Sequence, residues 1–91
     1  MPYTCPACGY DELREEPRGD NTGGSYEICP SCGIQFGLDD EAGGDPVRRL
    51  EIYTKWRQEW IKQGTPWNSV GIAPPRDWNP SEQIRRLLMK Q

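Results

Sequence analysis

The segments Cys5-Pro6-Ala7-Cys8-Gly9 and Cys29-Pro30-Ser31-Cys32-Gly33 follow one pattern, C-P-x-C-G, and contain all four cysteines of a 91-residue chain without histidine. We call them the first and the second knuckle. The proline presets φ and the glycine can adopt a positive φ, so each segment can curl and aim two sulfurs at one point. Two C-x-x-C pairs separated by 20 residues are typical of a four-thiolate metal site. The sequence therefore predicts one metal ion bound by Cys5, Cys8, Cys29 and Cys32.

Two other interpretations of the cysteines, a pair of disulfides and a redox site, are less favoured. The chain begins Met1-Pro2-Tyr3-Thr4, without the basic and apolar segments of a secretory signal. We therefore expect a cytoplasmic, reducing compartment, which disfavours disulfides. A redox C-x-x-C usually accompanies a βαβ pattern, which this sequence lacks. No apolar run approaches the ~20 residues of a membrane span, so we expect no membrane association.

The ligand set by itself does not choose between zinc and iron, because both ions accept four thiolates in a tetrahedron. The stretch from Tyr3 to Tyr10, followed by the second knuckle, is similar to rubredoxin, an iron electron carrier with the same two knuckles. The loop between the knuckles is shorter here than in typical rubredoxins. We expect zinc, and iron is the alternative.

Composition indicates a small core. Hydrophobic residues make up 34% of the chain, which also contains 10 glycines and 9 prolines. Such a chain commonly needs a staple, and metal binding couples directly to folding. We predict a small metal-stapled α+β fold in which zinc-ribbon (rubredoxin-like) β-hairpins are followed by one long and one short α-helix. Residues 1–40 form the ribbon, residues 18–25 its turn-rich connector, and residues 41–91 a helical extension packed on it as a single structural unit.

The long helix is expected to begin at Pro46, with Asp45 as its N-cap, and to end before Gly64. Its apolar residues recur three or four apart, and we expect the helix to pack on the ribbon through Leu50, Tyr53 and Trp60. The other members of this face are Val47 and either Trp56 or Arg57.

The short helix is expected to begin at Pro80, capped by Asn79, with an apolar stripe of Ile84, Leu87 and Leu88. A helix of this length is not stable alone, so it must dock. It either packs back on the first helix or reaches a second copy of the chain. We expect the preceding segment 64–79 to cross the surface and to insert its tryptophan side chains into the fold.

Charge is unevenly distributed. Residues 1–45 contain ten acidic and two basic side chains, whereas residues 46–91 contain four acidic and nine basic ones. We interpret the asymmetry as attraction between the two halves rather than as a nucleic-acid surface, because the net charge is −3. The acidic run Asp39-Asp40-Glu41 lacks the spacing of a calcium loop, and we interpret it as a solvated loop rather than a site for a hard cation.

The segment from Tyr3 to Asp40 resembles a group of small bacterial cysteine-rich proteins, the CPCC type. The shared elements are Cys8-Gly9-Tyr10, Gly23-Gly24, Tyr26-Glu27-Ile28-Cys29-Pro30, Cys32 and Asp39-Asp40. The chain departs from that group in its first knuckle, where the group usually has Cys-Pro-Cys-Cys, and in Ile34–Leu38, which replaces an aromatic-acidic stretch. The resemblance implies a metal-bound ribbon in a bacterial protein and implies no activity.

These observations favour a non-enzymatic protein-interaction module, with a protein partner or self-association. Histidine, the usual general base at neutral pH, is absent, and a four-thiolate site leaves no position for water. No site for a small-molecule substrate is evident. The alternatives are a nucleic-acid-binding ribbon, a rubredoxin-like electron carrier, and a small acidic immunity or antitoxin-like protein. For nucleic acid, Trp56 or Trp60 would stack on bases beside Arg48, Arg49, Lys55, Arg57, Lys62, Arg85, Arg86 and Lys90.

Overall fold

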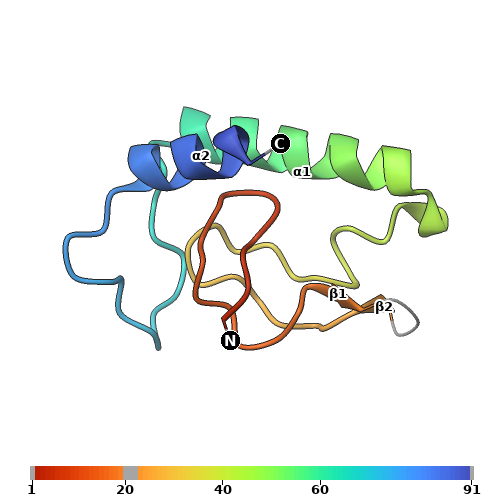
Figure 1. The fold of residues 1–91 in the computed structure, drawn as a ribbon, viewed down its shortest axis with the longest axis horizontal. Coiled ribbons are helices and arrows are strands. Elements are labelled where there is room, and N and C mark those ends of the chain that lie inside the picture. The colour runs from red at the N-terminus through yellow and green to blue at the C-terminus, as the bar shows by residue number, and fades with distance from the viewer. Residues whose placement is uncertain (1, 20–22, 91) are drawn as a thin grey trace.

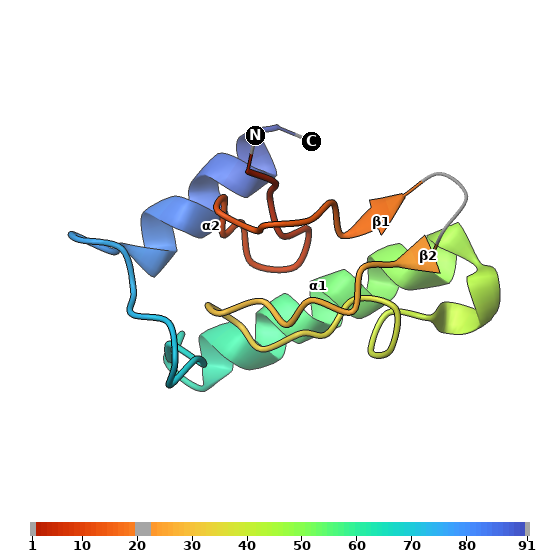
Figure 2. The same ribbon diagram turned by 90° about the horizontal axis from the view of Figure 1, so that it is seen from below.

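The computed structural model describes residues 2–19 and 23–90. In chain order the elements are β1 (Arg18–Gly19), β2 (Gly23–Gly24), the 3-10 helix η1 (Ala42–Gly44), α1 (Pro46–Lys62) and α2 (Pro80–Met89). The two helices form one layer, and the loops that carry the knuckles form a second layer packed against it (Figure 1). Seen from the loop side, α1 and α2 are set apart from one another (Figure 2).

The predicted ribbon hairpins are wrong in their extended form. Within the described residues, each knuckle is flanked only by an isolated β-bridge, Tyr3 with Leu13 and Ile28 with Gln35. The one pair of strands there, β1 with β2, lies in the connector that was expected to be turns. The centre of that connector, residues 20–22, is outside the described residues. The backbone pairing beside each knuckle is limited to a few hydrogen bonds, such as that from the Cys5 amide to the Tyr10 carbonyl and that from the Cys29 amide to the Ile34 carbonyl, and these do not extend into a regular ladder.

The predicted long helix is confirmed as α1. The Asp45 carboxylate accepts hydrogen bonds from the amides of Val47 at 3.0 Å and Arg48 at 3.4 Å. The helix ends at Lys62, and Gly64 follows with φ of +94°. These are the expected N-terminal and C-terminal signals.

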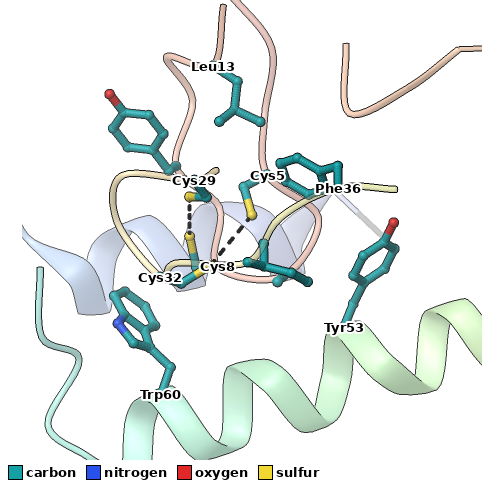
Figure 3. Packing of buried hydrophobic residues seen from close by; sticks show 11 residues of the cluster. Cys5, Cys8, Leu13, Cys29, Cys32, Phe36, Tyr53 and Trp60 are labelled. Carbon is teal, nitrogen blue, oxygen red and sulfur yellow. Dashed lines mark hydrogen bonds between the residues drawn. The ribbon is translucent and has the colours of Figure 1, made fainter. Parts of the chain in front are cut away.

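The packing face of α1 was predicted correctly in part. Tyr53 and Trp60 are buried, but Leu50 is 63% exposed, so its assignment to the core is wrong. Val47, on the same predicted face, is 65% exposed. Tyr53 and Trp60 are two turns apart and share one direction, whereas Leu50 lies 60–80° around the helix from them by the ~100° step per residue. The loops that carry the knuckles cover the side of α1 with Tyr53 and Trp60 and leave Leu50 outside the contact (Figure 3).

The short helix is confirmed as α2, with the Asn79 side chain accepting from the Glu82 amide. Leu87 is buried, whereas Leu88 is 48% exposed and does not belong to the core. The segment that precedes α2 packs on the same chain through its tryptophans. The Trp67 ring lies 5.7 Å from that of Tyr10 and 5.0 Å from that of Trp78. Within the chain, α2 docks on the first knuckle through Gln83 rather than on α1, while Trp78 touches α1 with its ring 6.4 Å from that of Trp60. The expected docking on the first helix is therefore confirmed for this tryptophan and not for α2, and docking on a second copy stays a prediction.

The core is centred on the cysteines and draws on both the loops and the helices. Figure 3 shows the four sulfurs between Leu13 and Phe36 on one side and Tyr53 and Trp60 of α1 on the other. None of the helices in the described ranges has both the length and the apolarity needed to cross a membrane.

Candidate metal centre

The two knuckles bring all four sulfurs together. Their Sγ atoms lie within 4.8 Å of one another, and all four cysteines are buried. The sulfurs interleave across the knuckles, with Cys5 at 3.9 Å from Cys32 and Cys8 at 3.7 Å from Cys29 (Figure 3). Among the described residues, this is the one cluster of three or more cysteine or acidic side chains that could hold a metal ion.

The cluster has the dimensions of a tetrahedral thiolate site. An ion with four metal–sulfur bonds of about 2.3 Å places its sulfurs about 3.8 Å apart, because the edge of a tetrahedron is about 1.63 times its centre-to-corner distance. The distances of 3.7 and 3.9 Å match that edge. They are far longer than the ~2.05 Å of a disulfide bond, and all four thiols are free. The site therefore fits a metal ion, whose identity the donor set leaves open.

The backbone of the two knuckles repeats. The amide of Gly9 donates to the Cys5 carbonyl at 2.9 Å, and the amide of Gly33 donates to the Cys29 carbonyl at the same distance. Both glycines have a positive φ, +90° and +83°. The role predicted for the glycine of the C-P-x-C-G pattern is thereby confirmed, because an L side chain rarely adopts this φ.

Burial opposes the ionisation of the thiols. Desolvation, with hydrogen bonds to the other three thiols, holds the pKa of Cys5 well above its usual range. Burial also opposes ionisation of Cys8, but hydrogen bonds with Cys29, Cys32 and Cys5 outweigh it and lower the pKa of Cys8. A positive ion at the centre of the cluster would compensate the charge of all four thiolates at once.

Side chains of α1 reach the backbone of both knuckles. Trp56 Nε1 donates to the carbonyl of Cys32, and Arg57 Nη1 donates to the carbonyl of Ala7, both at 3.1 Å. Trp56 is also packed against the core. These contacts fix the helix to the loops on either side of the sulfurs.

The C-terminal segment closes the other side of the site. Gln83 Nε2 donates to the Cys8 carbonyl and to Ser31 Oγ, both at 3.1 Å, so one amide joins the two knuckles. Its Oε1 accepts from Trp78 Nε1 at 3.0 Å. In addition, the amide of Asn68 donates to the carbonyl of Pro30 at 3.1 Å. Such partners of the ligand backbone orient the ligands of a metal site.

Gln83 was missed by sequence reasoning. A glutamine is ordinarily exposed, but this one is 4% exposed. Its spacing contained a usable signal, since it lies one turn before the buried Leu87 and therefore on the same face of α2. A polar residue on the inner face of a short amphipathic helix indicates a buried hydrogen-bond partner.

Asp40 also departs from expectation. It was assigned to a solvated loop, yet it is fully buried. Its Oδ1 accepts from Arg18 Nη2 at 2.8 Å and from the Gly37 amide at 2.6 Å, and its Oδ2 accepts from the Tyr53 hydroxyl at 2.5 Å. These partners link the connector and the residues after the second knuckle to α1.

The electrostatics of this network follow from its burial. Burial opposes ionisation of Asp40, but the bonds from Arg18, Tyr53 and Gly37 more than offset it and hold the pKa of Asp40 below its usual value. Burial and the neighbouring carboxylate raise the pKa of Tyr53. Asp40 is therefore an internal anion with its own cationic partner, and no carboxylate of the described acidic run joins a multi-residue cation cluster.

Compared with family models, curated proteins and solved structures, the chain matches none. The resemblances to the CPCC group and to rubredoxin therefore rest on the knuckle residues and their neighbours alone.

Proposed function

We propose that the chain is a non-enzymatic, cytoplasmic protein of the zinc-ribbon kind, in which one structural zinc ion organises a small surface for a protein partner. The observation that carries the proposal is the buried cluster of four free thiols with the edge lengths of a tetrahedral site. Structural zinc sites in small domains are commonly of this four-cysteine type, and binding of the ion supplies folding free energy.

The same cluster supports a structural rather than a catalytic ion. A catalytic zinc usually keeps one position open for water, whereas four thiolates complete the tetrahedron. The layers around the sulfurs also leave the cysteines almost without solvent contact, with Cys32 the most exposed at 7%.

The surroundings of the basic residues support a protein partner over a nucleic acid. Arg57 donates to the Ala7 carbonyl and Arg49 to the Asp40 carbonyl, so these two guanidinium groups are engaged inside the chain. Trp60 is buried, and Trp56 is half-buried against the core with its Nε1 bonded to the Cys32 carbonyl, so both rings take part in packing within the chain. Large apolar side chains are exposed instead, which is typical of protein-interaction surfaces.

The experiment is metal analysis of the purified protein with an absorption spectrum, for the intact chain and for Cys8→Ser. We expect about one zinc per chain, no visible absorption, and loss of metal and cooperative folding in the variant. Thr4→Ser is the control. It introduces a serine next to the first knuckle without removing a ligand, and we expect it to keep its metal. A protein that melts cooperatively with free thiols and less than about half an equivalent of metal contradicts the proposal. A coloured, iron-containing protein would instead favour the alternative function, electron transfer.

A further inference from the structure

One side of α1 carries three large apolar side chains that the chain itself leaves exposed. Val47, Leu50 and Ile61 are 65%, 63% and 48% exposed. With Thr54 and Arg57 they follow the spacing 47, 50, 54, 57, 61, alternately three and four residues apart, along nearly the whole of α1. This is the heptad spacing with which one helix packs along another. We call these five residues the α1 stripe.

The stripe is complementary to itself along its length. In an antiparallel pair centred on Thr54, Val47 of one copy lies level with Ile61 of the other, so the exposed apolar side chains at the two ends of the stripe meet across the axis. A hollow of about 460 Å³, lined by Pro6, Leu50, Tyr53, Thr54 and Arg57, lies beside this line of contact.

The polar rim beside the stripe carries both signs of charge. Glu51 and Lys55 are one turn apart on the side away from the loops, and both are exposed. When two α1 helices pack antiparallel about Thr54, the two-fold axis places the same rim of each copy side by side. Glu51 of each copy then lies close to Lys55 of the other, so the rim is complementary in charge to a second copy of itself.

We infer that the α1 stripe is the contact surface for a second copy of this chain, which forms an antiparallel, two-fold symmetric dimer centred on Thr54. The inference rests on the proposed function, since it names the protein partner of that module. The dimer requires the chain to be folded, but it does not depend on which metal is bound. The dimer covers Val47, Leu50 and Ile61, which otherwise remain an uncovered apolar face.

The test is sedimentation of the metal-loaded protein at concentrations up to about 100 µM, the weak end of specific association. We expect a dimer for the intact chain and a monomer for Leu50→Glu. Val70→Glu is the matched control, because Val70 is fully exposed and lies outside α1, and it stays dimeric. A dimer that persists in Leu50→Glu overturns the inference, as does an intact chain that remains monomeric.

A charge exchange tests the symmetry without touching the apolar residues. Glu51→Lys alone and Lys55→Glu alone each place like charges across the axis and should weaken the dimer roughly tenfold. The double variant restores the pairing and should recover the affinity of the intact chain. Equal weakening in the double variant overturns the antiparallel arrangement. Metal content measured on the same samples keeps the two proposals separate: a metal-loaded monomer contradicts only the dimer, and a metal-free dimer contradicts only the metal centre.

Discussion

The side-chain amide of Gln83 donates a 3.1 Å hydrogen bond to the carbonyl oxygen of Cys8, 75 residues earlier in the chain. The same nitrogen reaches Ser31 Oγ in the second knuckle. One residue of the C-terminal helix therefore holds the backbone of both metal-binding segments, and the stability of the centre depends on a helix that contributes no ligand.

Replacing Gln83 should destabilise the protein without removing a ligand. Gln83→Leu leaves the Ser31 hydroxyl, the Cys8 carbonyl and Trp78 Nε1 without their partner, and each buried unsatisfied group costs about 1–3 kcal/mol. We expect a loss of roughly 3 kcal/mol in the free energy of unfolding of the metal-loaded protein, measured with urea. Gln63→Leu makes the same exchange at an exposed position and should change it by less than about 0.5 kcal/mol. Similar effects at both positions would contradict the assigned role.

Gly9 and Gly64 separate backbone strain from close packing. Their φ values are nearly equal, +90° and +94°, so alanine costs about 1 kcal/mol in backbone strain at either position. A Cβ at Gly9 would lie 2.5 Å from the carbonyl oxygen of Gln83, whereas at Gly64 it meets no described atom within 4 Å. We expect Gly9→Ala to be more destabilising than Gly64→Ala by a further ~1–3 kcal/mol in urea unfolding. Equal losses would mean that α2 does not press on the first knuckle.

Trp60 and Leu50 test which side of α1 is buried. Trp60 is 4% exposed, and Trp60→Ala should cost about 3–5 kcal/mol of unfolding free energy through the cavity it leaves. Leu50→Ala, at a protein concentration where the chain is monomeric, should cost less than about 0.5 kcal/mol, as for an exposed residue. Thermal or urea unfolding of the two variants provides the comparison. A larger loss of stability in Leu50→Ala than in Trp60→Ala would contradict the burial of the Trp60 side of α1.

The lowered pKa of Asp40 leads to a prediction about how stability depends on pH. Its pKa is lowered on folding, so its contribution is fully present above the unfolded pKa of about 3.9 and is lost as pH falls through the lower folded value. Asp40→Asn leaves the half-buried Arg18 without its main anionic partner and should cost roughly 2–3 kcal/mol. The difference in unfolding free energy between the intact chain and this variant should be constant from about pH 8 to pH 5. A difference that shrinks across this window would show that Asp40 takes up a proton there.

Local signals in the sequence were sufficient to predict the ligand cluster and both helices. The curl of C-P-x-C-G is set by φ preferences within five residues, and the caps Asp45 and Asn79 act on amides two or three positions away. Such interactions do not depend on the rest of the chain, which is why the starts of α1 and α2 agree with prediction. Extended strands beside the knuckles were predicted wrongly because β-like alternation over two or three residues is too short to specify a regular ladder, and the arms meet only in isolated bridges.

The tertiary structure alone decided which residues surround the cluster. Apolar spacing assigned Leu50, Tyr53 and Trp60 to one face of α1, but a period of 3.6 residues does not say which part of a wide stripe the neighbouring layer covers. Asp40 and Gln83 are buried because Arg18, Tyr53, Cys8 and Ser31 arrive beside them from distant positions. A polar side chain becomes part of a core only where its partners are brought to it, and that depends on how the whole chain closes around the four sulfurs.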